Sequence, residues 1–215
     1  MNFRLLGFPV SVDSSVALIG LMWLAYGLRD REPFVLALGG VLIIFTSILW
    51  HELGHAFAAR AFGLGPIDIA IHGFGGLTRH RPSGRPWKDL LVTLAGPGNG
   101  LLLGVVALVA QRFVHADLAS DLIRQVAFIN LFWSVFNLMP MFPMDGGQAL
   151  YAVLRIFAPA NAHRITGGIG LAMAALVMAF AIFLVVNGGG TAIFLGYFAF
   201  TSGQRCWQLF NARAR

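Results

Sequence analysis

Charged side chains are scarce in this sequence. They make up 11% of its 215 residues, whereas a soluble domain carries about 25%. Hydrophobic residues make up 58% of the chain, and its mean hydropathy is +0.76. Because so few polar side chains are available to face water, we expect an integral membrane protein in a lipid bilayer rather than a soluble protein. The length predicts one domain over residues 1–215.

Cysteine is almost absent as well. The single Cys206 excludes an intrachain disulfide and a zinc site made of several cysteines. The first residues include Pro9 and Asp13 and contain no continuous apolar core, so we expect no cleavable signal peptide.

Lysine and glutamate are rare too, with one lysine and two glutamates beside fourteen arginines. The net charge is +6, a value that can indicate a nucleic-acid partner. Here, however, the positive residues stand between apolar runs, as they do at the ends of membrane spans. We therefore expect no nucleic acid among the partners.

The apolar residues gather into six segments separated by polar or glycine-rich stretches. Because a helix of about 20 apolar residues crosses a bilayer, this pattern predicts an α-helical polytopic membrane protein with about six transmembrane helices. The third segment is interrupted at residues 95–100, and the fourth breaks at Pro140 and Pro143. The six segments are residues 14–28, 33–62, 89–110, 122–138, 165–186 and 191–210.

Two shorter segments have the pattern of strands. Residues 3–13 contain an alternating Val-Ser-Val stretch after Pro9, which favours a strand over a helix. Residues 67–77 alternate, are β-branched and include a glycine-rich turn at 73–76, which predicts a strand or hairpin. We expect them to form a small re-entrant β-hairpin or sheet at the cytoplasmic side.

The positive residues also predict the orientation. With the N-terminus in the cytoplasm, eleven Arg and Lys residues fall on the cytoplasmic side and four on the other side. Cytoplasmic loops carry the excess of these residues, so both termini are expected in the cytoplasm. The four residues on the other side are Arg29, Arg31, Arg112 and Arg124.

The stretch His51-Glu52-Leu53-Gly54-His55 directly follows the uncharged run of residues 33–50. On a helix the two histidines stand at i and i+4 on one face, the spacing that lets two imidazoles share one zinc ion. Glu52 lies beside them, where it could act as general base on a water molecule. The alternative is a polar helix end, but three ionisable groups beside a bilayer-spanning segment are costly without a function.

Catalytic zinc usually has three protein ligands, so this site needs one more. Asp145 follows the other span that runs from outside to inside, and it therefore reaches the same depth as the histidines. Prolines break the helix before it, and Gly146 and Gly147 allow close approach of the backbone. In a soluble protein such an aspartate is more often a helix cap. Here the depth and the missing ligand favour Asp145 as the third ligand of one Zn²⁺ per chain.

The histidine motif and the stretch at residues 137–147 together resemble the site-2 protease family of intramembrane zinc metalloproteases. Residues 6–12 resemble the family's N-terminal strand, and the glycine-rich hairpin resembles its membrane re-entrant β-element. Ala95-Gly96-Pro97 resembles its Gly-Pro motif, and Asn130 and Asn137 match a recurrent pair of asparagines. The resemblance covers essentially the whole chain.

The chain departs from the family pattern at two positions. Asn99 stands two residues after Pro97, where the family commonly has an asparagine three residues after it, and Met144 replaces the usual leucine before Asp-Gly. Neither a PDZ nor a CBS module is recognisable, so a minimal form is expected.

The resemblance implies hydrolysis of peptide bonds in membrane-spanning substrates, such as anti-sigma factors or membrane-tethered transcription regulators, in a prokaryotic inner membrane. The hairpin at Gly73, Phe74 and Gly75 would offer an edge on which an unwound substrate helix adds as a strand. Asn137 would donate a hydrogen bond to the substrate or the oxyanion. Equally, Asn137 could satisfy carbonyls that the break at Pro140 leaves free.

Two other functions compete with proteolysis. A metal transporter would be expected to carry polar residues on several spans. A protease-like scaffold without activity would be expected to lack Glu52. A di-iron membrane oxidase needs several histidine clusters, and the six histidines here form one ligand-spaced pair. The sequence therefore favours a protease.

Overall fold

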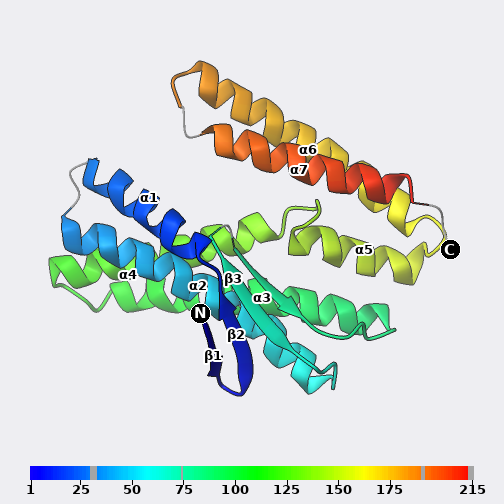
Figure 1. Cartoon of the computed structure of the whole chain (residues 1–215), viewed down its shortest axis with the longest axis horizontal. Coiled ribbons are helices and arrows are strands. Elements are labelled where there is room, and N and C mark those ends of the chain that lie inside the picture. Colours follow the sequence, from blue (N-terminus) through cyan, green and yellow to red (C-terminus); the bar gives the residue numbers. More distant parts are fainter. Residues whose placement is uncertain (30–32, 74, 190–191, 213–215) are drawn as a thin grey trace. The chain divides into compact units, whose positions relative to one another are not determined.

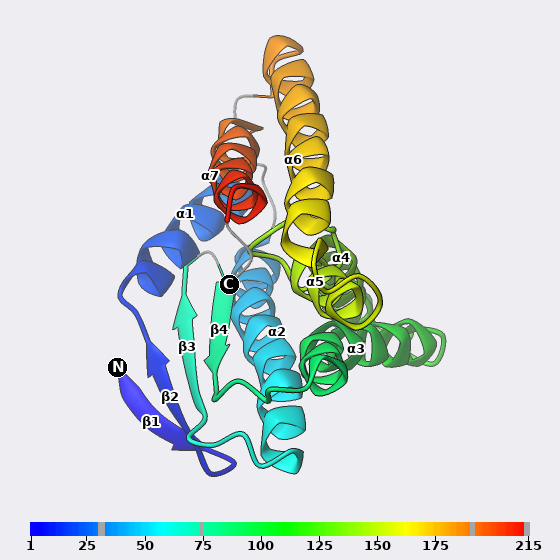
Figure 2. The ribbon, with the colours of Figure 1, turned by 90° about the vertical axis from the view of Figure 1, so that its right-hand side faces the viewer.

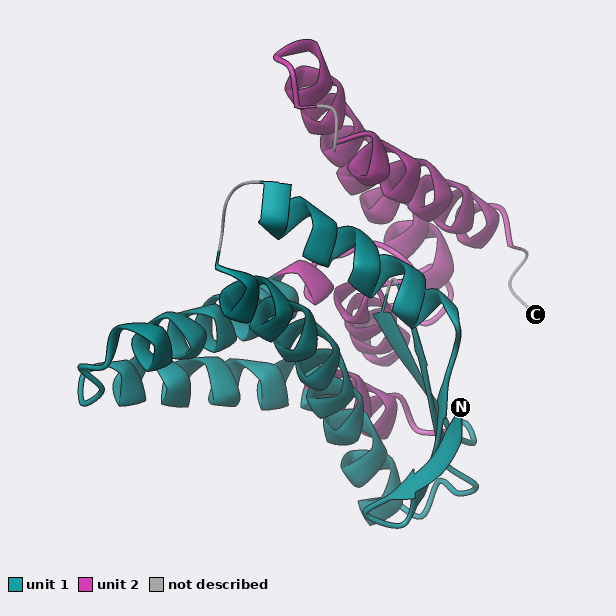
Figure 3. Ribbon diagram, turned by 60° about the vertical axis from the view of Figure 1, so that its left-hand side comes forward, with its two compact units in different colours: residues 1–83, 95–135 teal, residues 84–94, 136–215 magenta. Residues whose placement is uncertain are grey.

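The computed structural model describes residues 1–29, 33–73, 75–189 and 192–212 (Figure 1). Its packing divides into two compact units, residues 1–83 with 95–135 and residues 84–94 with 136–215 (Figure 3). The single domain expected from the length stays a prediction. The helices are α1 Ser15–Arg29, α2 Phe34–Ala61, α3 Pro86–Gln111, α4 Asp117–Asn137, α5 Asp145–Phe157, α6 Ala162–Val186 and α7 Ala192–Phe210. The strands are β1 Asn2–Leu5, β2 Phe8–Val12, β3 Asp68–His72 and β4 Gly75–Arg79.

The sheet of the first unit confirms the two strand-forming segments. Strands β1 and β2 form an antiparallel hairpin, β2 pairs in parallel with β3, and β3 pairs antiparallel with β4. The order in the sheet is β1-β2-β3-β4, and β4 lies alongside α2 (Figure 2). The turn of the first hairpin has positive φ at Leu6 and Gly7, a conformation that glycine adopts without steric cost.

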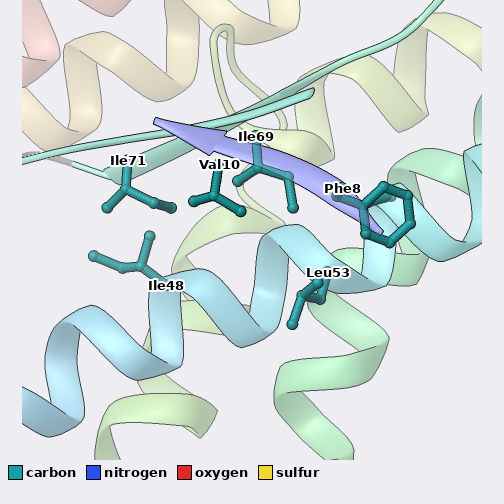
Figure 4. Close-up of a cluster of buried hydrophobic side chains, with 7 residues drawn as sticks. Phe8, Val10, Ile48, Leu53, Ile69 and Ile71 are labelled. Carbon is teal, nitrogen blue, oxygen red and sulfur yellow. The ribbon is translucent and has the colours of Figure 1, made fainter. Parts of the chain in front are cut away.

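One face of the sheet packs on α2. Alternate side chains of a strand point to the same face, and those of β2 and β3 point toward the helix, where they meet Ile48 and Leu53 (Figure 4). This core fixes the sheet against the helical turn that carries the histidine motif. Its buried members are Phe8, Val10, Ile48, Leu53, Ala56, Ile69 and Ile71.

Among the described residues, three helices, α2, α3 and α6, are long and apolar enough to cross a membrane. They confirm the spans predicted at residues 33–62, 89–110 and 165–186. The first predicted span is the shorter apolar helix α1, and the remaining two coincide with α4 and α7. Arg31 and Thr191, which entered the predictions above, lie outside the described residues. The chain is thus an integral membrane protein with several apolar helices.

The interruption expected in the third span is wrong. Helix α3 continues through its glycine-rich centre with Pro97 inside it. Proline removes one hydrogen bond from a helix interior and is therefore unfavourable there. Close packing against α2 compensates, since a Cβ at Gly54 of α2 would lie only 2.9 Å from the Ala95 carbonyl carbon.

In the second unit, a turn at residues 138–144 precedes α5. Gly146 and Gly147 permit this turn, because a Cβ at Gly147 would lie 2.6 Å from the Met141 carbonyl carbon and one at Gly146 would overlap the Leu138 carbonyl. The close backbone approach predicted for this glycine pair is confirmed. Asp89 of α3 and Arg155 of α5 form an ion pair at 3.2 Å that joins the two helices.

Candidate metal centre

Helix α2 carries the histidine motif near its C-terminal end. His51, Glu52 and His55 are buried, with exposed fractions of 3%, 5% and 8%. Each offers one ligand atom, and these atoms all lie within 4.8 Å of one another. Because burial of ionisable groups is costly unless other groups satisfy them, their convergence at one point marks a functional site.

The two imidazole rings approach each other through their Nε2 atoms. Nε2 of His51 lies 3.1 Å from Nε2 of His55, and the ring planes are inclined by 75°. Two imidazole nitrogens on one tetrahedral zinc ion are about 3.3 Å apart. The distance also suits an N–H···N hydrogen bond in one tautomer. The Glu52 carboxylate beside the pair is the group that a zinc hydrolase needs as base, so the three residues fit a catalytic zinc ion.

Helix α3 forms a wall of this site through Gly96. A Cβ built on Gly96 would overlap the His55 ring and lie 2.7 Å from its Cδ2. On the facing helix, Gly54 packs equally closely on Ala95. Small residues on both helices let the backbones approach, and the segment Ala95-Gly96-Pro97 thereby holds the His55 ring in place.

We expect Gly96→Ala to lower zinc affinity about 10- to 100-fold, because the added methyl group must displace the His55 ring or separate the helices. Zinc retained by the purified variant after dialysis against a graded chelator series measures the effect. The matched control is Gly98→Ala on the same helix, where an added Cβ meets nothing within 4 Å. Equal zinc affinity in the two variants would contradict the assignment of Gly96 as the wall of the His55 site.

Strand β4 contacts Glu52. The hydroxyl oxygen of Thr78 lies 2.7 Å from Glu52 Oε2 and 3.0 Å from the Glu52 carbonyl oxygen. Gly76 precedes Thr78 by two residues, and a Cβ there would lie 2.7 Å from Glu52 Cδ. Thr78 was missed in the sequence. The alternation of the strand shows that residues 76 and 78 share a face, but not which helical side chain this face meets.

Polar contacts tie α2 to its neighbours just before the motif. Asn99 donates to the Trp50 carbonyl at 2.6 Å, and the Trp50 indole donates to the Asn99 carbonyl at 3.1 Å. Asn130 of α4 donates to the Ser47 hydroxyl at 2.8 Å. These bonds give a structural role to Asn99, which stands one position away from the family's usual asparagine, and to Asn130.

Asp145 and Asn137 belong to the second unit. Asp145 is the first residue of α5 and Asn137 the last residue of α4, and both are buried. The N-cap of α5 is Met144, not Asp145, so Asp145 does not occupy the cap position that was its alternative. Burial of a carboxylate requires a compensating group. The roles of both residues as ligand and substrate contact stay predictions.

The hairpin turn contacts the start of α1. The backbone N–H of Gly73 donates to the Ser15 hydroxyl at 3.0 Å, and a Cβ at Gly75 would lie 3.7 Å from the Trp133 ring. Hydrogen bonds from Ser15, its side chain first and its backbone N–H second, lower the pKa of Asp13 just before the helix. Phe74 lies outside the described residues. A substrate contact by this turn stays a prediction.

Comparison with known proteins relates part of the chain to one peptidase family. The model of peptidase family M50 matches residues 39–117. A zinc metalloprotease of Methanocaldococcus jannaschii is 26% identical over 182 residues, which are 84% of this chain and 53% of the relative. A relative from Synechocystis sp., which carries the provisional name of a zinc metalloprotease, is 34% identical over 161 residues, 70% of this chain and 42% of the relative. Over residues 39–117 the chain matches peptidase family M50, and its fold is that of a site-2 protease.

The fold of the chain agrees with that of a solved structure. The site-2 protease from Methanocaldococcus jannaschii matches it with a TM-score of 0.71 over 94% of each chain, at 23% sequence identity. The chain spans about half the length of the relatives named above, 53% and 42%.

Proposed function

We propose that this chain is an intramembrane zinc metalloprotease that hydrolyses peptide bonds of membrane-spanning substrates. One observation carries the proposal: Nε2 of His51 and of His55 meet at 3.1 Å in a buried site of an apolar helix. The Glu52 carboxylate lies within 4.8 Å of both. A water-activating zinc site on a helix that can cross a membrane is the chemistry that such hydrolysis requires.

The proposed ligand set is His51, His55 and Asp145, with one zinc ion per chain. Three protein ligands leave a fourth tetrahedral position open, as catalytic zinc sites do. The burial of Asp145 and its place inside the first turn of α5 support its assignment. When bound, zinc would polarise the scissile carbonyl and make the attacking water more acidic.

The proton transfers are assigned to Glu52. Its carboxylate takes a proton from the attacking water and delivers it to the amine that leaves when the peptide C–N bond breaks. The hydroxide equivalent adds to the carbonyl carbon, so the products are a carboxylate and a free amine. Asn137 is proposed to donate a hydrogen bond to the substrate carbonyl or the oxyanion, since its amide brings no charge into lipid.

The substrate is proposed to bind as a strand beside β4, near the turn at Gly73 to Gly75. Within the described sheet β4 is the last strand, and a terminal strand offers backbone groups for a further one. A peptide bond inside a substrate helix is shielded by the helix, so the substrate has to unwind locally before it can be cut. Anti-sigma factors and membrane-tethered transcription regulators are the proposed substrates.

The proposed location is a prokaryotic inner membrane with both termini in the cytoplasm. The excess of Arg and Lys on one side of the spans supports this orientation. It places the histidine motif of α2 in the cytoplasmic half of the bilayer.

The test is cleavage of single-span substrates by the purified chain in detergent, with the cut mapped by mass spectrometry. Cleavage inside the apolar segment of a substrate is expected. A zinc-loaded wild type that cuts no member of a broad panel, or that cuts only in exposed loops, would contradict the proposal and favour a zinc-binding scaffold.

A further inference from the structure

Thr78 is the polar side chain of β4 that reaches the Glu52 carboxylate. Its hydroxyl oxygen lies 2.7 Å from Oε2 and 3.0 Å from the Glu52 backbone carbonyl. A hydroxyl has a single proton to donate. Bonds from a hydroxyl to a carboxylate are shorter and stronger than those to a neutral carbonyl, and the shorter contact here is the one to Oε2. With Glu52 ionised, the proton therefore belongs to the bond with the carboxylate.

Strand β4 has a glycine where the Glu52 side chain packs against it. Gly76 lies on the same face of β4 as Thr78, two residues earlier. A Cβ at Gly76 would lie 2.7 Å from both Cδ and Oε1 of Glu52. The glutamate therefore lies flat against the strand, with Oε2 at Thr78 and Oε1 beside the backbone of Gly76. Thr78 and Gly76 together restrict the rotation of the carboxyl group.

The contact joins two elements that no local sequence rule connects. Glu52 is on α2, and Thr78 is 26 residues further along the chain. The sheet is itself held on α2 by the buried core around Ile48 and Leu53. The sheet therefore fixes the position of Thr78. Thr78 in turn restrains the Glu52 side chain, which would otherwise be free to rotate about three bonds.

We propose that Thr78 is a positioning residue for the general base. It holds Oε2 of Glu52 so that Oε1 is the oxygen that accepts the proton from the attacking water. The inference rests on the proposed function of Glu52. A base is efficient only when its accepting atom is held within hydrogen-bond reach of the proton it removes, and a glutamate anchored through one oxygen keeps the other in a fixed direction.

The test compares Thr78→Val, which keeps the shape and removes the hydroxyl, with Thr78→Ser, which keeps the hydroxyl. We expect Thr78→Val to lower kcat about 10- to 100-fold, the usual range for a group that orients another, with KM and bound zinc unchanged. Thr78→Ser is expected to restore most of kcat. The matched control is Thr46→Val on α2. The Thr46 hydroxyl donates to Leu42 and Ile43 of its own helix, so its loss should leave kcat unchanged.

A wild-type kcat in Thr78→Val would overturn the proposal. So would a Thr78→Ser variant as slow as Thr78→Val, or a loss confined to KM or to bound zinc, since each of these indicates packing, substrate binding or metal retention instead of orientation of the base.

A second measurement does not depend on cleavage. The midpoint of thermal unfolding is compared for wild type, Thr78→Val, Glu52→Ala and the double variant. If the hydroxyl bonds to the carboxylate, Thr78→Val lowers the midpoint more in the wild-type background than in the Glu52→Ala background, where only the bond to the backbone carbonyl of residue 52 remains. Equal shifts in both backgrounds would refute the bond. If the wild type cleaves nothing while this coupling is present, the proposed protease function fails and the Thr78–Glu52 contact stands.

Discussion

Glu52→Gln is expected to lower kcat by about 10²- to 10⁴-fold, the contribution of a well-placed general base. Glutamine has almost the same shape as glutamate and can still accept a hydrogen bond from Thr78, which lies 2.7 Å from Oε2 in the wild type. It cannot take a proton from water at neutral pH. The two histidines do not change, so zinc is expected to remain bound at the wild-type ratio.

The measurement is the rate of cleavage of a single-span substrate in detergent, together with zinc per chain in the same sample. The control is Asp68→Asn, which removes an exposed carboxylate of β3 that pairs with Arg79 at 3.4 Å. Its rate should equal that of the wild type. Cleavage by Glu52→Gln at more than about a tenth of the wild-type rate would assign the base to another group.

Asp145→Ala is expected to remove most of the bound zinc and, with it, the activity. In the proposed ligand set, loss of Asp145 leaves only the two histidines. Even groups that only orient a ligand change metal affinity about 10- to 100-fold. We therefore expect zinc affinity to fall by at least about 100-fold. The measurement is zinc per chain after dialysis against a competing chelator, with unfolding temperature as a check on the fold.

Asp117→Ala is the matched control for this variant. Both aspartates are in the first turn of a helix, Asp145 in α5 and Asp117 in α4, so both interact favourably with the helix dipole. Asp117 is exposed and is not a proposed ligand. Zinc retained by both variants would eliminate Asp145 as the third ligand, and zinc lost from both would indicate a general effect of helix destabilisation.

The sequence predicts the parts of this fold that depend on local patterns. An uncharged run followed by a compact polar motif predicts α2 and the histidines at i and i+4, because helical periodicity alone brings them to one face. The patterns in residues 3–13 and 67–77 predict the strands that pack on α2, and Phe8 and Ile69 of these strands are buried. The family resemblance extends this to the whole chain.

The sequence does not predict what distant segments do to each other. Helix α3 continues through Pro97 because its glycines pack against α2, and that packing outweighs the local preference of proline to end a helix. Thr78 reaches Glu52 because two features fix the position of β4 along α2. These are the pairing of β3 with β4 and the hydrophobic core between the sheet and the helix. The position of a strand along a helix leaves no periodic signal in the sequence. The same is true of the close approach of two helices at their glycines.

The most direct test of the central claim is a zinc titration of the chelated wild-type protein. We predict that removal of zinc abolishes cleavage, and that activity returns in proportion to added zinc until one ion is bound per chain. We also predict that a variant with both His51→Ala and His55→Ala binds no zinc at this site and stays inactive. Undiminished cleavage by fully zinc-free protein, or full zinc binding by the double histidine variant, would contradict the assignment of His51, Glu52 and His55 as a catalytic zinc site.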